Sequence, residues 1–164
     1  MDLMLLPLEG KRKWQPLLQT RFTEAGARIS PDGRWMAYSC DESGRLEVYV
    51  RAFPTLDAKV QVSTAGGREP VWSKRGNELY FRTAEAMMAV SLQARGSDLS
   101  VGQSRKLFVN KYYLKGGTHT GYDVARDGRF LMVRMGVTLE GGIPVRSSLN
   151  VVLNWTEELK SRIK

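Results

Sequence analysis

The chain has 164 residues, of which 42% are hydrophobic. That length suits one domain, and a domain of this size buries roughly 70% of the surface that its unfolded chain exposes. Twenty-five Lys and Arg against 17 Asp and Glu leave a net charge of +8, which favours an anionic partner. However, the basic clusters at 11–13 and 160–164 are short and contain no interleaved aromatic residues, so we interpret them as solvated loop and tail and do not expect nucleic-acid binding.

Cysteine and histidine are each represented once, which limits disulfide and metal chemistry. Cys40 has no second cysteine with which to form an internal disulfide, and His119 has no second histidine for a zinc pair. We expect Cys40 to be a small buried residue, and we predict no metal and no cofactor. The apolar run at 3–8 is too short to span a membrane and follows Asp2, so this chain shows no membrane span and no signal peptide.

The expected elements are strands throughout. Residues 1–20 match the third and fourth strands of a later unit. Residues 21–64 predict four strands, the last three being "WMAYS", "LEVYVRAF" and "KVQVST". Residues 65–110 predict four more, and residues 111–155 predict three, which end in "SLNVVLNW". The polar tail, 156–164, follows, and a short helix could form at the very end.

A turn recurs in three of these units. Ser30-Pro31-Asp32-Gly33 has the residues of a type I turn, in which proline fixes φ and glycine supplies the left-handed residue that closes the turn. Aligning Gly33 with Gly76 and Gly128 gives spacings of 43 and 52 residues, and an apolar strand follows each glycine. A period near 40 to 45 residues is typical of propeller blades.

The repeat predicts an all-β fold: a partial β-propeller of about three four-stranded antiparallel blades, with incomplete blades at both ends. We expect one repeat array and no second domain. The polar, glycine-rich stretches at 64–69, 94–104, 115–121 and 140–148 are interpreted as loops within this array.

Residues Ser30 to Arg34, "SPDGR", resemble the WD40-like PD40 repeat of TolB-type β-propellers. The third copy keeps Asp127-Gly128-Arg129, whereas the middle copy keeps only Gly76. The chain is also similar to the C-terminal propeller region of bacterial serine/threonine protein kinases, whose last blade commonly ends in a "VVLNW" strand, here 151–155. These resemblances imply a propeller attached to a signalling protein. A periplasmic parent propeller is compatible with them, but the compartment is left open.

Thirteen expected strands are too few for the usual ring of four to eight four-stranded blades. Three explanations remain open: a fragment of a longer propeller, self-association that completes one, or an open array. We favour the fragment, because the first residues match the second half of a blade.

The sequence offers no convincing catalytic apparatus. Gly102-Gln103-Ser104-Arg105-Lys106 lacks the final glycine of a G-x-S-x-G nucleophile motif, and no kinase signature occurs. We therefore predict a non-catalytic interaction or sensing module that binds a protein or peptide. The alternative is the gating segment of a prolyl-oligopeptidase-type serine peptidase whose catalytic domain is absent.

The register of the repeat gives a candidate binding site. Innermost strands line a propeller's central channel, and polar residues occupy their entries in all three copies. The alternative is that these are ordinary polar loop residues. The candidate residues are Glu24, Arg28, Arg68, Glu69, His119, Tyr122 and Asp123.

Overall fold

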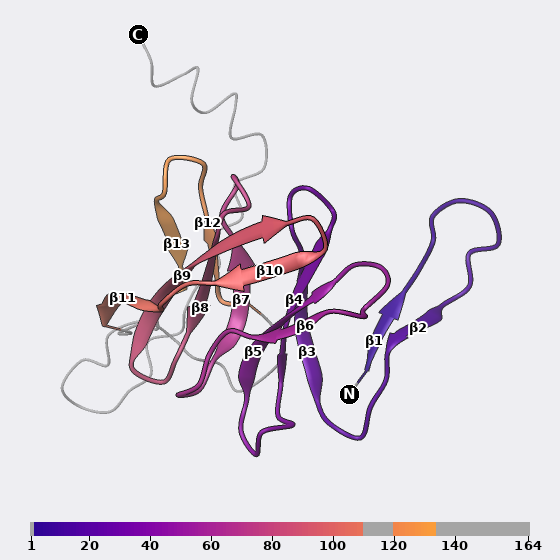
Figure 1. Ribbon diagram of the computed structural model, residues 1–164, viewed down its shortest axis with the longest axis horizontal. Coiled ribbons are helices and arrows are strands. Elements are labelled where there is room, and N and C mark those ends of the chain that lie inside the picture. Colours follow the sequence, from indigo (N-terminus) through magenta and orange to yellow (C-terminus); the bar gives the residue numbers. More distant parts are fainter. Residues whose placement is uncertain (1, 110–119, 134–164) are drawn as a thin grey trace, which may run out of the picture. The chain divides into compact units, whose positions relative to one another are not determined.

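A computed structural model describes residues 2–109 and 120–133 of the chain. These residues belong to the first of two compact units, Met1–Val133, and the second unit is Arg134–Lys164. In the described ranges the fold is all-β, as predicted, with antiparallel strand pairing and no helix (Figure 1). The strands are β1 (Leu3–Leu5), β2 (Gln15–Leu18), β3 (Glu24–Ile29), β4 (Trp35–Cys40), β5 (Glu47–Ala52), β6 (Lys59–Gln61), β7 (Arg68–Trp72), β8 (Glu78–Arg82), β9 (Ala86–Arg95), β10 (Asp98–Val101), β11 (Arg105–Val109), β12 (Tyr122–Val124) and β13 (Phe130–Met132).

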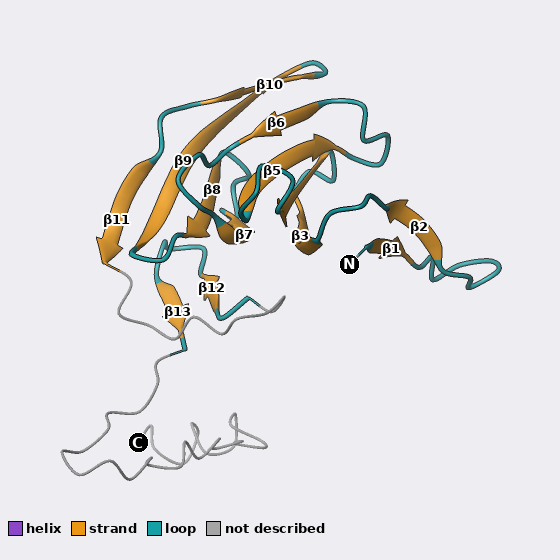
Figure 2. Cartoon of the chain, turned by 90° about the horizontal axis from the view of Figure 1, so that it is seen from below, coloured by secondary structure: helices purple, strands orange, loops and turns teal. Residues whose placement is uncertain are grey.

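The strands form successive antiparallel sheets in chain order. β3-β4-β5-β6 is a four-stranded meander, and β7-β8-β9 begins the next sheet in the same way. β1 pairs with β2, and β12 pairs with β13. Figure 2 shows the first strands of the two larger sheets, β3 and β7, next to each other, and the two strands are in contact. Sheets of this meander type are the blades that the repeat predicted.

The central strands of the two larger sheets are buried on both faces because each of these sheets packs between two others. In β4, Trp35 and Ala37 join an apolar cluster with Trp72 and Phe81 of the second sheet. Since side chains alternate along a strand, Met36 and Tyr38 point to the opposite face, toward β1–β2. Burying a side chain of this size contributes roughly 1.5 to 3 kcal/mol, so the apolar contact between sheets stabilises the fold.

A further apolar cluster joins the second sheet to β12–β13. Tyr80 and Met87 pack there against Tyr122 and Val124. The ring of Phe130 meets that of Tyr80 edge-on at 5.1 Å between centroids. These aromatic rings therefore pack between the second sheet and β12–β13.

The three aligned turns have the predicted conformation. Gly33, Gly76 and Gly128 have φ values of 73°, 75° and 85°. In each turn the glycine N–H donates to the carbonyl three residues earlier, that of Ser30 (2.9 Å), Ser73 (2.9 Å) and Ala125 (3.1 Å). The turn is therefore the same structural unit in all three copies.

The second sheet differs from the expected four-stranded blade. The stretch 94–104 was predicted to be a loop, but β9 continues to Arg95 and turns at Gly96 into β10. β10 pairs with the second half of β9, and β11 pairs with the first half, so the sheet has five strands. The loop prediction was wrong because β10 has only four residues, two of them polar, although all four pair with β9.

Other expectations fall partly or wholly outside the described ranges. Cys40 is buried, as expected. The expected "VVLNW" strand and terminal helix lie outside the described residues. In the described part of the chain, no helix has the length and apolar character needed to cross a bilayer.

Candidate binding site

The first strands of three successive repeats, β3, β7 and β12, are joined by side-chain hydrogen bonds. The indole Nε1 of Trp72 on β7 donates to the carbonyl oxygen of Arg28 on β3, at 2.9 Å. The hydroxyl of Tyr122 on β12 donates to the carbonyl oxygen of Glu69 on β7, at 2.8 Å. An aromatic donor therefore connects β7 to β3, and a second connects β12 to β7.

A bulge at one register position shapes these strands. The pairing of β3 with β4 is irregular between Ala25 and Arg28, and Gly26 has a φ of 65° there. Glu69 lies 43 residues later, at the corresponding bulge of β7, and has a φ of 56°. A left-handed conformation is strained for residues other than glycine, at a cost of about 1 to 3 kcal/mol. Some other interaction must hold Glu69 in place.

The carboxylate of Glu69 supplies that interaction. Glu69 is buried, and its Oε2 lies 3.3 Å from Nη1 of Arg82, which is fully buried. The same oxygen accepts a hydrogen bond from the backbone N–H of Gly121, at 2.8 Å. Gly121 precedes β12, so one buried carboxylate ties the second repeat to the third. Removing one partner of such a buried pair costs about 3 to 5 kcal/mol, which exceeds the local strain.

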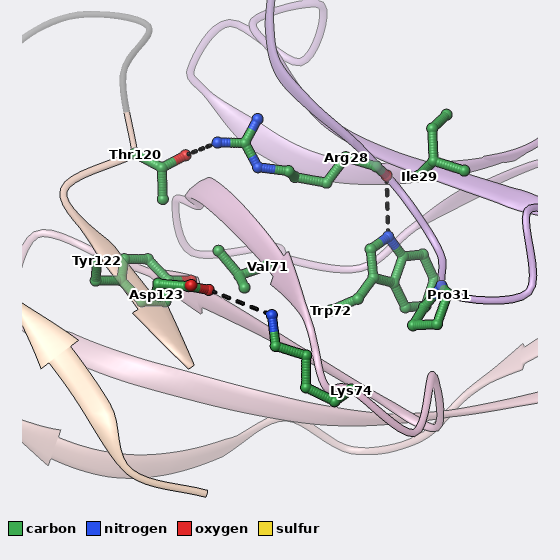
Figure 3. A pocket seen from close by; sticks show the side chains of 9 residues that line it. All are labelled: Arg28, Ile29, Pro31, Val71, Trp72, Lys74, Thr120, Tyr122 and Asp123. Atoms are coloured by element: carbon green, nitrogen blue, oxygen red, sulfur yellow. Dashed lines mark hydrogen bonds and ion pairs between the residues drawn. The ribbon is translucent and has the colours of Figure 1, made fainter. Parts of the chain in front are cut away.

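A groove, which we call the inner groove, lies over these joined strands. It has a volume of about 390 Å³ and receives side chains from β3, β7 and β12 and from adjoining loops (Figure 3). The lining residues are Arg28, Ile29, Pro31, Val71, Trp72, Lys74, Thr120, Tyr122 and Asp123.

The charged groups of the inner groove are accessible to a ligand. The exposed Arg28 donates from Nη2 to the hydroxyl of Thr120, at 3.1 Å, across the groove. Nζ of Lys74 lies 3.8 Å from Oδ1 of Asp123, and these two side chains are 47% and 66% exposed. Exposed ion pairs contribute only about 0 to 1 kcal/mol, so a ligand can replace this one at little cost.

Tyr122 forms part of the groove floor in its neutral form. It is buried, and burial followed by the nearby charge of Glu69 raises the pKa of its phenol well above the ordinary value of 10.0. At neutral pH the phenol keeps its proton and donates it to the Glu69 carbonyl oxygen. It is therefore a fixed part of the floor and is not poised as a base.

The seven predicted site residues separate in the structure. Arg28, Tyr122 and Asp123 come together in the inner groove, and Glu69 supports it from beneath. Glu24 is buried at the start of β3, where its Oε1 accepts a hydrogen bond from the hydroxyl of Thr20. Arg68 is half-buried at the start of β7 and does not line this groove, and His119 lies outside the described residues.

The groove also contains residues that the sequence reasoning missed, notably Val71, Trp72 and Lys74. Repeat register could have identified Val71, because it occupies the position of Arg28 and Asp123 in the middle copy. Because Val71 and Trp72 are apolar, their side chains indicated only packing in the core. Trp72 is indeed buried between the sheets, and it also borders the groove.

The arrangement can recognise a ligand by charge, by hydrogen bonding and by apolar contact. The groove holds a guanidinium, an ammonium and a carboxylate beside a half-exposed Ile29 and the edge of Trp72. In 2–109 and 120–133, no three His, Cys, Asp or Glu side chains are grouped as metal ligands.

Successive antiparallel meanders, packed face to face with their first strands side by side, define the class of fold as propeller-type β-blades. No family model matches the chain, and no curated protein matches it. Among solved structures, the chain is similar to a protein described as TolB from Agrobacterium tumefaciens, with 16% sequence identity and a TM-score of 0.47. The similar region covers 66% of this chain and 42% of the TolB chain.

Proposed function

We propose that this chain is a non-catalytic propeller module that binds a protein segment or peptide in the inner groove. The observation that carries the proposal is the convergence of three successive repeats on one groove, through Arg28, Trp72 and Asp123. A groove built from separate repeats is positioned by the packing between blades rather than by a single loop. It is therefore organised before the ligand arrives, which lowers the entropic cost of binding.

The chemistry of the inner groove favours a peptide over a small apolar ligand. Its polar and charged side chains, Arg28, Lys74 and Asp123, are spread along the groove, while Ile29 and Trp72 supply apolar contact. Peptide main chains need hydrogen-bond partners along their length, and apolar pockets between these partners give specificity. An extended segment fits this alternation.

Selection of random twelve-residue peptides displayed on phage against the purified chain tests the proposal. Synthetic copies of the selected peptides should bind at least tenfold more weakly to Arg28→Ala and to Asp123→Ala, because each variant removes a groove charge. Lys13→Ala, an exposed change in the β1–β2 loop, is the matched control and should leave affinity unchanged. Equal affinity for all variants, with unchanged melting temperatures, would place binding elsewhere and exclude the inner groove.

The wider setting of the module is a separate part of the proposal. The "SPDGR" turn at 30–34 and the "VVLNW" segment at 151–155 support a PD40-type propeller linked to a bacterial serine/threonine kinase and acting in signal transduction. The neighbouring coding sequence tests this setting. A kinase domain encoded upstream supports it, whereas an α/β-hydrolase domain downstream supports the peptidase gating role instead.

A further inference from the structure

A second groove lies between the turns of the second and third repeats, and we call it the turn groove. It has a volume of about 330 Å³. Its lining residues are Ser73, Lys74, Arg75, Asn77, Glu78, Tyr80, Val124, Ala125, Arg126, Asp127 and Gly128. Lys74 borders both grooves, so the turn groove adjoins the inner groove.

The middle turn departs from its two neighbours at the residue before the glycine. In the first and third turns this residue is an aspartate. Asp32 accepts a hydrogen bond from the N–H of Arg34, and Asp127 accepts one from the N–H of Arg129, both at 3.1 Å. Arg75 occupies the same position in the middle turn and cannot accept such a bond. A local rule broken at one copy of a repeat is expected where function requires it.

The carboxylates around the turn groove already have cationic partners. Glu78 is 2.6 Å from Nη2 of Arg105 and also accepts a hydrogen bond from the hydroxyl of Tyr80, at 3.0 Å. Asp127 is 2.8 Å from Nε of Arg129. Arg105 and Arg129 lie outside the lining, so these carboxylates are neutralised from the periphery of the groove.

The arginines of the turn groove are not neutralised in this way. Arg75 and Arg126 are exposed, and neither has an ion-pair or hydrogen-bond partner among the described residues. Two unpaired guanidinium groups, with the ammonium of Lys74 nearby, leave a positive potential in a concave surface, where field lines are concentrated. Guanidinium groups bind carboxylates through two parallel hydrogen bonds.

We propose that the turn groove binds an acidic peptide segment, whose carboxylates pair with Arg75 and Arg126. The inference rests on the proposed function, because the segment continues past Lys74 into the inner groove. The inference adds the chemistry of the partner. The peptide segment in the turn groove contains Asp or Glu residues, and it is continuous with the segment that occupies the inner groove.

A peptide fits this groove better than a nucleic acid does. Non-specific binding of single strands uses exposed aromatic rings for base stacking together with a track of cations. The one aromatic lining residue of the turn groove, Tyr80, is 8% exposed and packs against Phe130. Two arginines also provide few phosphate contacts.

The probe for the test is a fluorescein-labelled octaglutamate peptide, measured by fluorescence anisotropy at low ionic strength. Wild-type chain should bind the peptide saturably, and a labelled Gly–Ser octapeptide should not bind. Arg75→Glu with Arg126→Glu should weaken octaglutamate binding at least tenfold. Lys11→Glu with Lys13→Glu makes the same charge change in the exposed β1–β2 loop and should weaken it by less than twofold.

Three results would overturn the inference: no saturable binding of octaglutamate, equal loss in both double variants, or tighter binding of an eight-residue oligothymidylate that is lost in Arg75→Glu with Arg126→Glu. Thermal melts of each variant confirm that it is folded. The phage-selected peptides separate this inference from the proposed function. If they still depend on Arg28 while octaglutamate does not bind, the inner groove stands and the acidic partner is rejected.

Discussion

Gly33 lies at a position where only the backbone conformation restricts the residue. Its φ is 73°, and no atom lies within 4 Å of where a Cβ would be. We expect Gly33→Val to destabilise the chain by about 2 kcal/mol, because a β-branched residue is strained in the left-handed region. Gly33→Asn should cost less, since asparagine tolerates this region. Urea denaturation measures both, and equal midpoints for wild type and Gly33→Val would contradict the turn geometry.

The ionisation of Tyr122 should limit the stability of the fold at alkaline pH. Because burial and Glu69 raise its folded-state pKa above 10.0, its contribution to stability is fully present below pH 10 and is lost as pH rises through the folded-state pKa. In an absorbance titration at 295 nm, we expect a late ionisation that coincides with unfolding. Burial also raises the phenol pKa values of Tyr38, Tyr49 and Tyr80, so Tyr122→Phe should reduce the amplitude of this step by one tyrosine. The variant should cost about 1 kcal/mol at neutral pH, through the lost hydrogen bond to Glu69. A late step of unchanged amplitude in the variant would contradict the assignment.

Single residues also show where sequence reasoning reached its limit. Glu69 was predicted to lie at a polar rim, but its side chain is buried on Arg82, a partner 13 residues away on β8. The spacing of 43 residues that aligns Gly33 with Gly76 also places Glu69 opposite Gly26, so this substitution was visible in the register of the repeat. The left-handed conformation at that position was not visible, because glycine adopts other conformations as readily.

The middle turn lacks the proline and the aspartate that the first turn has. Lys74→Pro with Arg75→Asp would restore the "SPDG" pattern of the first turn. We expect this double change to stabilise the chain by about 0.5 to 1 kcal/mol, because proline restricts the unfolded chain and aspartate can accept the N–H of Asn77.

The same double change should abolish octaglutamate binding, because it removes two of the cations around the turn groove. Thermal melts and anisotropy titrations measure the two effects on one protein. A variant that is less stable than wild type would contradict the assignment of the middle turn as the same structural unit.

Elements were predictable where they repeat and were missed where they do not. The alternation of apolar residues and the three turn glycines predicted β3, β4, β7 and β8, of which the last three are buried along nearly their whole length. β10 has no counterpart in the first sheet, and of the four residues in "DLSV" only Leu99 and Val101 face the core, where they are partly buried. The signal available was Gly96-Ser97, a glycine-led pair between two runs that pair to each other, which is typical of a tight hairpin.

At the scale of the whole molecule, stability depends on packing between sheets more than on any one sheet. Each larger sheet contributes residues to two apolar clusters, and Val71 and Tyr80 belong to a different cluster from Trp72 and Phe81. The hairpins β1–β2 and β12–β13 differ from the larger sheets, because each consists of a single pair of strands and packs on only one larger sheet. An isolated two-stranded hairpin is marginal in water.

These two hairpins also carry the most exposed large apolar side chains among the described residues. Leu8 and Trp14 in the β1–β2 hairpin are 75% and 65% exposed, and Leu131 on β13 is 76% exposed. We therefore expect the isolated chain to self-associate, with β1–β2 of one copy against β12–β13 of another, which covers both surfaces at once. Size-exclusion chromatography with light scattering should give a mass above 18.5 kDa that rises with concentration. Trp14→Ser with Leu131→Ser should shift the mass toward the monomer, whereas Val109→Ser, which changes an exposed apolar residue on β11, should not. A constant monomer mass at all concentrations, or association that the double variant leaves unchanged, would show that these hairpins are not where copies meet.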